Sequence, residues 1–556
     1  CGAAARTNWH VASTGSDITG SGTLASPLSS IQTAINAATV GDTVSVAAGT
    51  YVENINFSGK NIAVIGADSS NTIIDGDSSG SVVSFNSGED TTAVLKNFTI
   101  TNGNANTGNY PNNAGAGVLI YNYSSPTLRN LIVTNNYASH GGGGIEINTY
   151  CNPLLDNVTI NQNSASRGAG LSVQERSNPE IKNTIISNNQ IDNTGSGLWG
   201  GGVCIESHSN PTFENVQITG NTATRGGGVY ISNQSNPTFE NVQITSNTAN
   251  GSGGGIYVEN SSSPVFSGNV SLLSNHANQE GGGFMVNGSG NYILSNIIIA
   301  NNTAGNRGAG IVAPNSYFLI QNSTIINNHA SGEGGGALFL SHNSNTNIVN
   351  SICWGNSPQE IWFDPNPGND PSQLSINYSD IQNGQTGIIT NGKGTVEWGT
   401  GNITTNPLFA DTANGNFTLQ AGSPSIDAGH PNAFYNDTNG TRNDMGYSGG
   451  NGITLSATKF NFGYLGVGDS RNKTLTITNN RSATISITGT TFDDTQFSTS
   501  TSFPVTVAAY SAADVTLTFM PASIGPQADT LQLSSADIPG DATYGEFALS
   551  GNGFDL

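Results

Sequence analysis

The apolar and polar positions of this chain recur in a unit of about 26 residues. Residues 209–223 read SNPTFENVQITGNTA, and residues 235–249 read SNPTFENVQITSNTA. Within a unit, apolar residues alternate with polar ones in three short runs, at 212–214, 216–218 and 229–231. Runs this short and this rich in β-branched residues favour strands over helices. The pattern therefore predicts a solenoid in which each coil of short strands packs on the next.

Two files of asparagine follow the repeat and mark its corners. Asparagine tolerates the left-handed backbone conformation that turns a strand sharply. We expect the side-chain amides of each file to stack from coil to coil, which predicts a three-faced parallel β-helix. The first file is Asn130, Asn157, Asn183, Asn215, Asn241, Asn269, Asn296, Asn322 and Asn350, and the second is Asn136, Asn163, Asn189, Asn221, Asn247, Asn275, Asn302, Asn328 and Asn356.

With this repeat and these files, residues 9–450 resemble the right-handed parallel β-helix superfamily, which includes pectate lyases, other polysaccharide lyases and many bacterial surface proteins. The resemblance implies the fold. It does not imply an activity, because one fold hosts many functions.

The start of this domain predicts a capping helix at about 29–40. Ile31, Ala34, Ile35 and Ala38 form an apolar stripe at helical spacing. The stretch is similar to the start of many bacterial β-helix proteins. Residues 1–8 are assigned to an N-terminal anchor or linker, because Cys1 followed by a small residue resembles the lipid-modified N-terminus of bacterial lipoproteins. The alternative is that the sequence happens to begin at a cysteine.

The coil spacing degrades after Trp354, so residues 355–450 are expected to form an irregular terminal region. The pieces NPLFAD, NFTLQAGSPSIDAG and NDTNGTRNDMGYSGG resemble the terminal region of bacterial surface β-helix proteins called choice-of-anchor Q. Asp437, Asn439 and Asp444 place oxygen atoms around a glycine, a pattern that suits calcium. The alternative is a glycine-rich turn whose acidic side chains bond its own amides.

Residues 453–556 follow a different pattern. Alternating strands of about six residues, separated by turn clusters, predict an antiparallel immunoglobulin-like β-sandwich. The stretch resembles the Hydin-type domains, also called choice-of-anchor D, that follow solenoids in bacterial surface proteins. The whole chain is therefore expected to be all-β, with two domains.

Composition limits the partners of the chain. Only 9% of its 556 residues are charged, and the formal net charge is −22 with 15 Lys plus Arg. Such a balance argues against a nucleic-acid partner and against an anionic membrane surface, apart from attachment through a lipidated Cys1. It suits an extracellular location, either as an outer-membrane lipoprotein or as a secreted protein.

One file of charged residues is a candidate for catalysis. A lyase acting on uronates needs a cation near the substrate carboxylate and a base near the abstracted proton. The alternative is a surface salt-bridge ladder, in which each pair is worth about 0 to 1 kcal/mol. The file lies before the glycine-rich strand and contains His140, Arg167, Arg225, Glu280, Arg307 and Glu333.

The strand after the glycines offers a candidate contact surface. One outward position per coil is apolar or aromatic from the middle of the solenoid onward, beside a flat band of glycines, and such strips commonly mark binding surfaces. Protein contact is favoured over sugar stacking. The alternative is that aromatic and β-branched residues simply suit exposed β positions. The predicted surface is Tyr230, Tyr257, Met285, Val312 and Leu338.

These observations favour an extracellular structural or adhesive β-helix protein that engages surface partners or other copies of itself and self-assembles. The alternative is a polysaccharide lyase or glycoside hydrolase acting in a groove along the β-helix. No cofactor is expected, although calcium binding and polysaccharide binding stay open.

Overall fold

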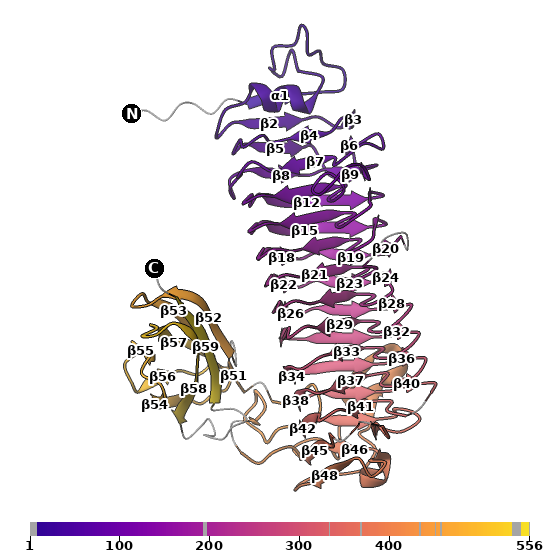
Figure 1. The fold of residues 1–556 in the computed structure, drawn as a ribbon, viewed down its shortest axis with the longest axis vertical. Coiled ribbons are helices and arrows are strands. Elements are labelled where there is room, and N and C mark those ends of the chain that lie inside the picture. Colours follow the sequence, from indigo (N-terminus) through magenta and orange to yellow (C-terminus); the bar gives the residue numbers. More distant parts are fainter. Residues whose placement is uncertain are drawn as a thin grey trace.

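The computed structural model describes residues 8–192, 197–332, 334–366, 368, 370–432, 435–450, 452–455, 459–535 and 546–554. The chain forms a β-solenoid of about 12 turns followed by a β-sandwich (Figure 1). The expected all-β fold is confirmed, since only 3% of the chain is helical.

A coil from the middle of the solenoid shows why the sequence repeats. Each strand pairs in parallel with the equivalent strand of the next coil, so that identical residues stack. The Phe213 and Phe239 rings, for example, lie 5.0 Å apart in the interior. The strands of two successive coils are β22 (Thr212–Glu214), β23 (Gln217–Thr219), β24 (Thr222–Ala223) and β25 (Val229–Ile231), then β26 (Thr238–Glu240), β27 (Gln243–Thr245), β28 (Thr248–Ala249) and β29 (Ile256–Glu259).

In the described residues the stacked strands form sheets of 21, 13 and 9 strands. The 13-stranded sheet follows the glycine runs and carries most of the candidate residues. Besides β25 and β29 it contains β4 (Ile55–Asn56), β7 (Val83–Phe85), β11 (Val118–Tyr121), β14 (Ile145–Asn148), β17 (Leu171–Val173), β21 (Val203–Ile205), β33 (Phe284–Asn287), β37 (Ile311–Pro314), β41 (Leu338–Ser341), β44 (Ile361–Phe363) and β47 (Ile388–Ile389).

The two asparagine files take different roles, which corrects the expectation of two equal ladders. In the second file, the Asn247 side-chain oxygen accepts from the backbone N–H and the side-chain amide of Asn221, at 3.0 Å each. This bonding repeats from Asn136 to Asn356 inside the solenoid. In the first file, Asn215 and Asn241 have φ of 55° and 54°, and Asn241 is exposed. Among the described residues of the first file, only Asn157 and Asn130 bond to each other side chain to side chain, at 2.9 Å, so this file serves chiefly the backbone corner.

A buried serine ladder supports another corner. The Ser209 N–H donates to the Ser235 hydroxyl, and the Ser177 N–H donates to the Ser209 hydroxyl. One coil earlier the position is Cys151, whose N–H donates to Ser177. Cys151, Cys204 and Cys353 are all buried and free.

A short helix lies at the N-terminal end of the solenoid (Figure 1). Helix α1 (Ile31–Ala37) begins after Ser30, whose hydroxyl accepts from the Thr33 N–H. Its residues Ile31, Ala34 and Ile35 are buried, as the apolar stripe predicts. The helix contacts β1 (Asn8–Val11) and β2 (Thr43–Val46) of the first coil.

Toward the C-terminal end of the solenoid, the first strands of the coils form a separate five-stranded sheet. It consists of β34 (Asn291–Ser295), β38 (Tyr317–Gln321), β42 (Asn345–Val349), β45 (Ser372–Asn377) and β48 (Gly394–Trp398). An irregular stretch then runs to residue 450 and includes the hairpin of β49 (Phe409–Asp411) and β50 (Asn416–Leu419).

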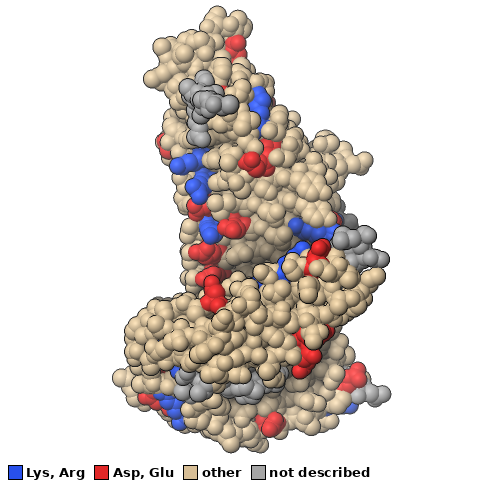
Figure 2. All heavy atoms as spheres, turned by 90° about the vertical axis from the view of Figure 1, so that its left-hand side faces the viewer, with Lys and Arg blue, Asp and Glu red and all other residues tan. Residues whose placement is uncertain are grey.

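The C-terminal sandwich packs beside the last coils (Figure 1). Leu319 and Val349 of the five-stranded sheet join Tyr435, Ile453 and the sandwich core in one buried cluster. Figure 2 shows that charged side chains are sparse on this side and that acidic and basic ones lie near one another. The sandwich strands are β51 (Ile453–Leu455), β52 (Lys459–Gly466), β53 (Arg471–Asn479), β54 (Ile485–Thr491), β55 (Phe497–Thr499), β56 (Val505–Val507), β57 (Ser511–Phe519), β58 (Gly525–Ser535) and β59 (Glu546–Phe554).

Candidate functional site

The outward face of the 13-stranded sheet carries one side chain per coil at a common register position, which we call the outward file. Its apolar members form a buried cluster separate from the solenoid interior. The file runs through Glu146, Ser172, Cys204, Tyr230, Tyr257, Met285, Val312 and Phe339.

The assignment of Leu338 to this surface is wrong. Leu338 lies in the interior core, and Val312 pairs with Phe339 instead. The reason is that Ala337 stands where the preceding coil has Gly310, the last glycine of its run. The hydrogen bond from the Ile311 N–H to the Ala337 carbonyl shows this register. A shift of one residue along a strand exchanges the inward and outward faces.

The outward file is covered by the chain's own turns. Met285 is only 8% exposed, and Tyr230, Tyr257 and Val312 less. The backbone folds directly onto these side chains: a Cβ added at Gly253 would lie 2.6 Å from the Tyr257 Cβ. The glycine runs therefore serve close approach of the chain to itself. The predicted contact surface is thus closed within the described chain.

Arginine side chains complete this cover. Arg225 lies 5.5 Å above the Tyr257 ring and 3.8 Å from the Glu259 carboxylate. Arg307 lies 4.5 Å above the Phe339 ring and donates to Glu280 at 2.8 Å. These ion pairs and ring contacts account for both arginines without a substrate.

Near the N-terminal end of the outward file, the candidate catalytic residues His140 and Arg167 contact other polar groups. His140 stands one position out of register, because Gly141 is the residue that pairs with Arg167. The two side chains still approach, with 3.3 Å between His140 Nε2 and Arg167 Nη2. Burial, followed by the Arg167 charge, lowers the pKa of His140. Arg167 also reaches Glu206 at 3.4 Å.

Glu146, which the sequence did not single out as a candidate, is the most perturbed acid of this face. It is fully buried, and burial raises its pKa to about 7. Its Oε1 accepts from the Tyr110 hydroxyl at 3.3 Å and from Asn148 at 3.2 Å, while Oε2 has no partner among the described residues. The Tyr110 side chain contacts both groups, since its hydroxyl donates to Glu146 and its ring lies 5.7 Å from the His140 ring.

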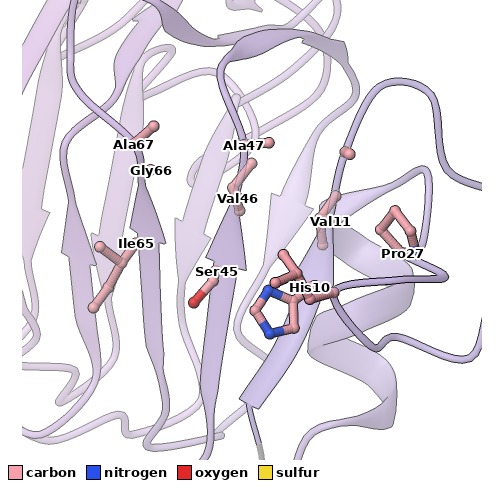
Figure 3. Close-up of a pocket in the computed structure, with 11 residues that line it drawn as sticks. His10, Val11, Pro27, Ser45, Val46, Ala47, Ile65, Gly66 and Ala67 are labelled. Carbon is pink, nitrogen blue, oxygen red and sulfur yellow. The ribbon is translucent and has the colours of Figure 1, made fainter.

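Two surface depressions of the described chain lie away from this face. The first, of about 350 Å³, lies beside the N-terminal coil (Figure 3). His10 is the one titratable side chain among the described residues that line it, and most of the rest are apolar. This lining provides no pair of acid and base groups.

The second depression, of about 430 Å³, lies over the turns that follow the 13-stranded sheet and is lined by Arg176, His208 and Gln234 among others. The sequence analysis missed these residues. Their signal is positional: each stands immediately before a Ser-Asn-Pro triplet in successive repeats.

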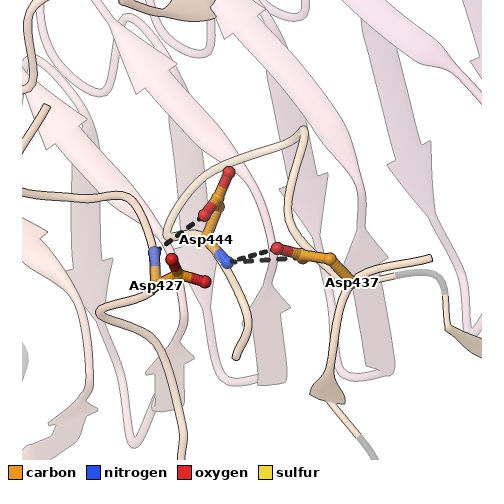
Figure 4. A group of neighbouring side chains, drawn as sticks. All are labelled: Asp427, Asp437 and Asp444. Carbon is orange, nitrogen blue, oxygen red and sulfur yellow. Dashed lines mark hydrogen bonds between the residues drawn. The ribbon is translucent and has the colours of Figure 1, made fainter. Parts of the chain in front are cut away.

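An acidic cluster occupies the irregular terminal region (Figure 4). Carboxylate oxygens of Asp427, Asp437 and Asp444 lie within 4.8 Å of one another. Burial, reinforced by the nearby charge of Asp444, raises the pKa of Asp437 to about 7. Asn439 turns elsewhere, because its side-chain oxygen accepts from the N–H and hydroxyl of Thr441. Of the predicted calcium ligands, only Asp437 and Asp444 are thus brought together by these contacts.

Two residues of interest, Cys1 and Glu333, lie outside the described residues. Within the described chain, no helix combines the length and the apolar character needed to cross a membrane.

Comparison with known proteins supports the two-part architecture. Residues 44–224 and 116–298 match the family described as right handed beta helix region. Residues 453–539 match the ASH family, described as abnormal spindle-like microcephaly-associated, ASPM-SPD-2-Hydin. No curated protein matches the chain.

Solved structures show weaker likeness. Pectate lyase Pel9A is 14% identical over 80% of this chain and 96% of its own, with a TM-score of 0.36. XylC in complex with xylose is 11% identical over 73% and 87%, with a TM-score of 0.39. An ASH / PapD-like domain of human CEP192 is 13% identical over 19% and 87%, with a TM-score of 0.15. Scores this low carry no functional argument. The chain is a parallel β-helix protein with a downstream immunoglobulin-like ASH domain.

Proposed function

We propose that this chain is an extracellular, cell-surface protein with a structural or adhesive role, in which the solenoid acts as a stiff rod that engages surface partners or further copies of itself. A β-helix followed by an ASH domain fits a surface or adhesive protein. The scarcity of charge and the net charge of −22 are consistent with this location. Attachment through a lipid on Cys1 belongs to the same proposal.

One observation carries the choice over an enzyme. A polysaccharide-cleaving enzyme working along the β-helix needs an open groove where cationic and acid or base side chains meet the polymer. In the described chain the candidate face is closed, because Arg225 and Arg307 lie over Tyr257 and Phe339 and pair with carboxylates. The side chains that would act on a substrate are engaged with one another.

The test measures adhesion and turnover side by side. Beads coated with the full chain are applied to bacterial cells and to each other, with albumin-coated beads as the control. We expect attachment or clustering above the control. In parallel, the chain is incubated with acidic and neutral polysaccharides, and no unsaturated uronate absorbance or new reducing ends should develop. Turnover that disappears in Arg167→Ala would overturn the proposal in favour of an enzyme.

A further inference from the structure

In a run of consecutive coils, the turn that follows the strand of the 13-stranded sheet holds two successive residues in the left-handed conformation. In three neighbouring coils these pairs are Glu175 and Arg176, Ser207 and His208, and Asn233 and Gln234, all with φ between 52° and 63°. The same turn contains Tyr123 and Tyr150 at φ of 63° and 59° in the two preceding coils. We call the second residues of these turns, Tyr123, Tyr150, Arg176, His208 and Gln234, the turn ridge.

The residue types of the turn ridge are costly for that backbone. The left-handed conformation costs a residue other than glycine roughly 1 to 2 kcal/mol, with asparagine as the cheap exception. At one other left-handed corner the chain uses asparagine, as at Asn183, Asn215 and Asn241, whereas a third corner also carries Gln162. At the turn ridge it keeps large side chains in spite of the strain. Large side chains held in this costly conformation at an exposed turn are candidates for a functional role.

The turn ridge is exposed and ordered by stacking. Tyr123 is 62% exposed and Tyr150 is 40% exposed, yet their rings lie parallel, 5.3 Å apart at an angle of 2°. Arg176 continues the stack, with its guanidinium 5.8 Å from the Tyr150 ring and a 2.7 Å bond to the Tyr150 hydroxyl. Flat side chains therefore stack on one another in successive coils.

The polar half of the turn ridge opens on the 430 Å³ depression. Glu175, Arg176, His208, Gln234 and Asn260 line it, and all five are exposed. The side chains of Glu175, His208 and Gln234 make no hydrogen bond to another described residue, whereas Asn260 donates to Asn233 at 3.1 Å. The depression thus presents carboxylate, imidazole and amide groups that make no hydrogen bond to another described residue, beside the Arg176 guanidinium, which bonds Tyr150.

We propose that the turn ridge and its depression bind a neutral polysaccharide lying along the axis of the rod. Planar amide, carboxylate, imidazole and guanidinium groups bond well to adjacent sugar hydroxyls, because each offers donors or acceptors spaced for a pair. The Tyr123 side chain, which is 62% exposed, offers an aromatic surface for the C–H groups of a sugar ring. Adjacent coils repeat at about 4.8 Å, so an extended glycan meets a new pair of side chains at each coil.

The charge and shape of the turn ridge favour this ligand class. Arg176 and His208 are its only basic members, Glu175 lies beside them, and the chain carries −22 overall, which disfavours nucleic acid and strongly acidic polymers. A protein partner would require a desolvated, largely apolar core of contact, while the depression is lined by polar side chains. The inference rests on the proposed adhesive function and names the partner class for it.

The test is affinity electrophoresis of the full chain in gels containing hydroxyethyl cellulose, mannan or xylan, with alginate as the acidic comparison. We expect retardation by at least one neutral polymer. The double variant His208→Asn, Gln234→Asn should bind about tenfold more weakly, since each lost hydrogen bond is worth about 0.5 to 1.5 kcal/mol. Its melting temperature should hold or rise, because asparagine relieves the left-handed strain. Tyr123→Asn should likewise bind more weakly while its melting temperature holds or rises. Gln243→Asn on the 21-stranded sheet should bind as the unmodified chain does.

Several outcomes contradict the proposal. It fails if no neutral polymer retards the chain, or if the double variant is retarded as strongly as the unmodified chain. Loss of bead attachment in the variant without retardation by any polymer would indicate a protein partner instead. If beads carrying the unmodified chain attach to cells while no polymer retards it, glycan binding fails and the adhesive function stands. If neither attachment nor retardation occurs, both fail.

Discussion

Asn241 and Asn247 lie six residues apart in one coil, yet their surroundings are opposite. Asn241 is exposed at a corner, with φ of 54°. Asn247 is fully buried, and its side chain bonds both neighbouring coils. The first asparagine is used for the backbone conformation it tolerates, and the second for the amide it carries. Identical residues at one repeat spacing can therefore contribute to stability through different terms.

The largest effect expected from this comparison is that of Asn247→Ala. The substitution leaves the Asn221 N–H and side-chain amide without their acceptor inside the solenoid. Each buried unpaired group costs about 1 to 3 kcal/mol. We expect the free energy of unfolding to fall by at least about 2 kcal/mol, measured by chemical denaturation. A loss no larger than that of Asn241→Ala would contradict the buried ladder.

Glu360, at the C-terminal end of the second asparagine file, should make the free energy of unfolding depend on pH. Glu360 accepts from the Asn356 side chain at 2.7 Å and from its N–H at 3.1 Å, and burial raises the Glu360 pKa to about 7. The folded chain thus keeps a proton that the unfolded chain releases near pH 4.5. This contribution to stability is complete below pH 4.5 and is lost as pH rises through about 7.

The variant Glu360→Gln removes that titration. Between pH 5 and pH 8 its free energy of unfolding should decline less than that of the unmodified chain, by about 1 to 3 kcal/mol. Thermal unfolding at both pH values measures the difference. Glu240→Gln, on the exposed surface, is the matched control and should keep the original pH dependence. Equal pH dependence in both variants would show that Glu360 is not the titrating group.

Asn241→Ala should have a smaller effect of different origin. Alanine at a positive φ costs roughly 1 to 2 kcal/mol, and the bond from the Asn269 N–H is exposed to water. We expect a loss of about 1 kcal/mol, mostly restored by Asn241→Gly, whereas glycine at position 247 should not restore stability. Gln243→Ala, with an exposed side chain, should stay within about 0.5 kcal/mol.

The smallest effect on stability should come from the arginine side chains that lie over the outward file. Arg225 is half exposed and lies 3.8 Å from Glu259, so water screens the pair. Arg225→Ala should reduce the free energy of unfolding by less than about 1 kcal/mol. High salt should shrink this difference further. A loss as large as that of Asn247→Ala would mean that the ion pair is far better shielded than its exposure indicates.

The repeat alone predicts much of the fold, because strand periodicity and corner residues are local properties. Phe213, Val216 and Ile218 point inward as their alternation indicates. The interior burial of Asn221 and its equivalents is less accessible from sequence, since both asparagine files show the same spacing. Only the packing of the next coil decides which amide is enclosed.

The candidate site was harder to predict, for two physical reasons. Alternation shows that Tyr257 points away from the interior, but it does not show that Gly253 and Arg225 fold over it. The acidic cluster joins Asp427 to Asp437 and Asp444 through tertiary folding of an irregular stretch. Neither kind of contact leaves a periodic signal.

Cys151, which takes a place in the serine ladder, and the other two buried thiols can report how the solenoid unfolds. Burial raises the pKa of Cys151 to about 12, and Cys204 and Cys353 are shifted upward for the same reason. The thiolate is the form that reacts with a maleimide, so these buried thiols react slowly in the folded chain. Each sulfur becomes reactive only after its own coil has separated from its neighbours. The three thiols stand in different coils along the axis, so the order in which they are labelled in mild denaturant reports the end from which the solenoid unzips.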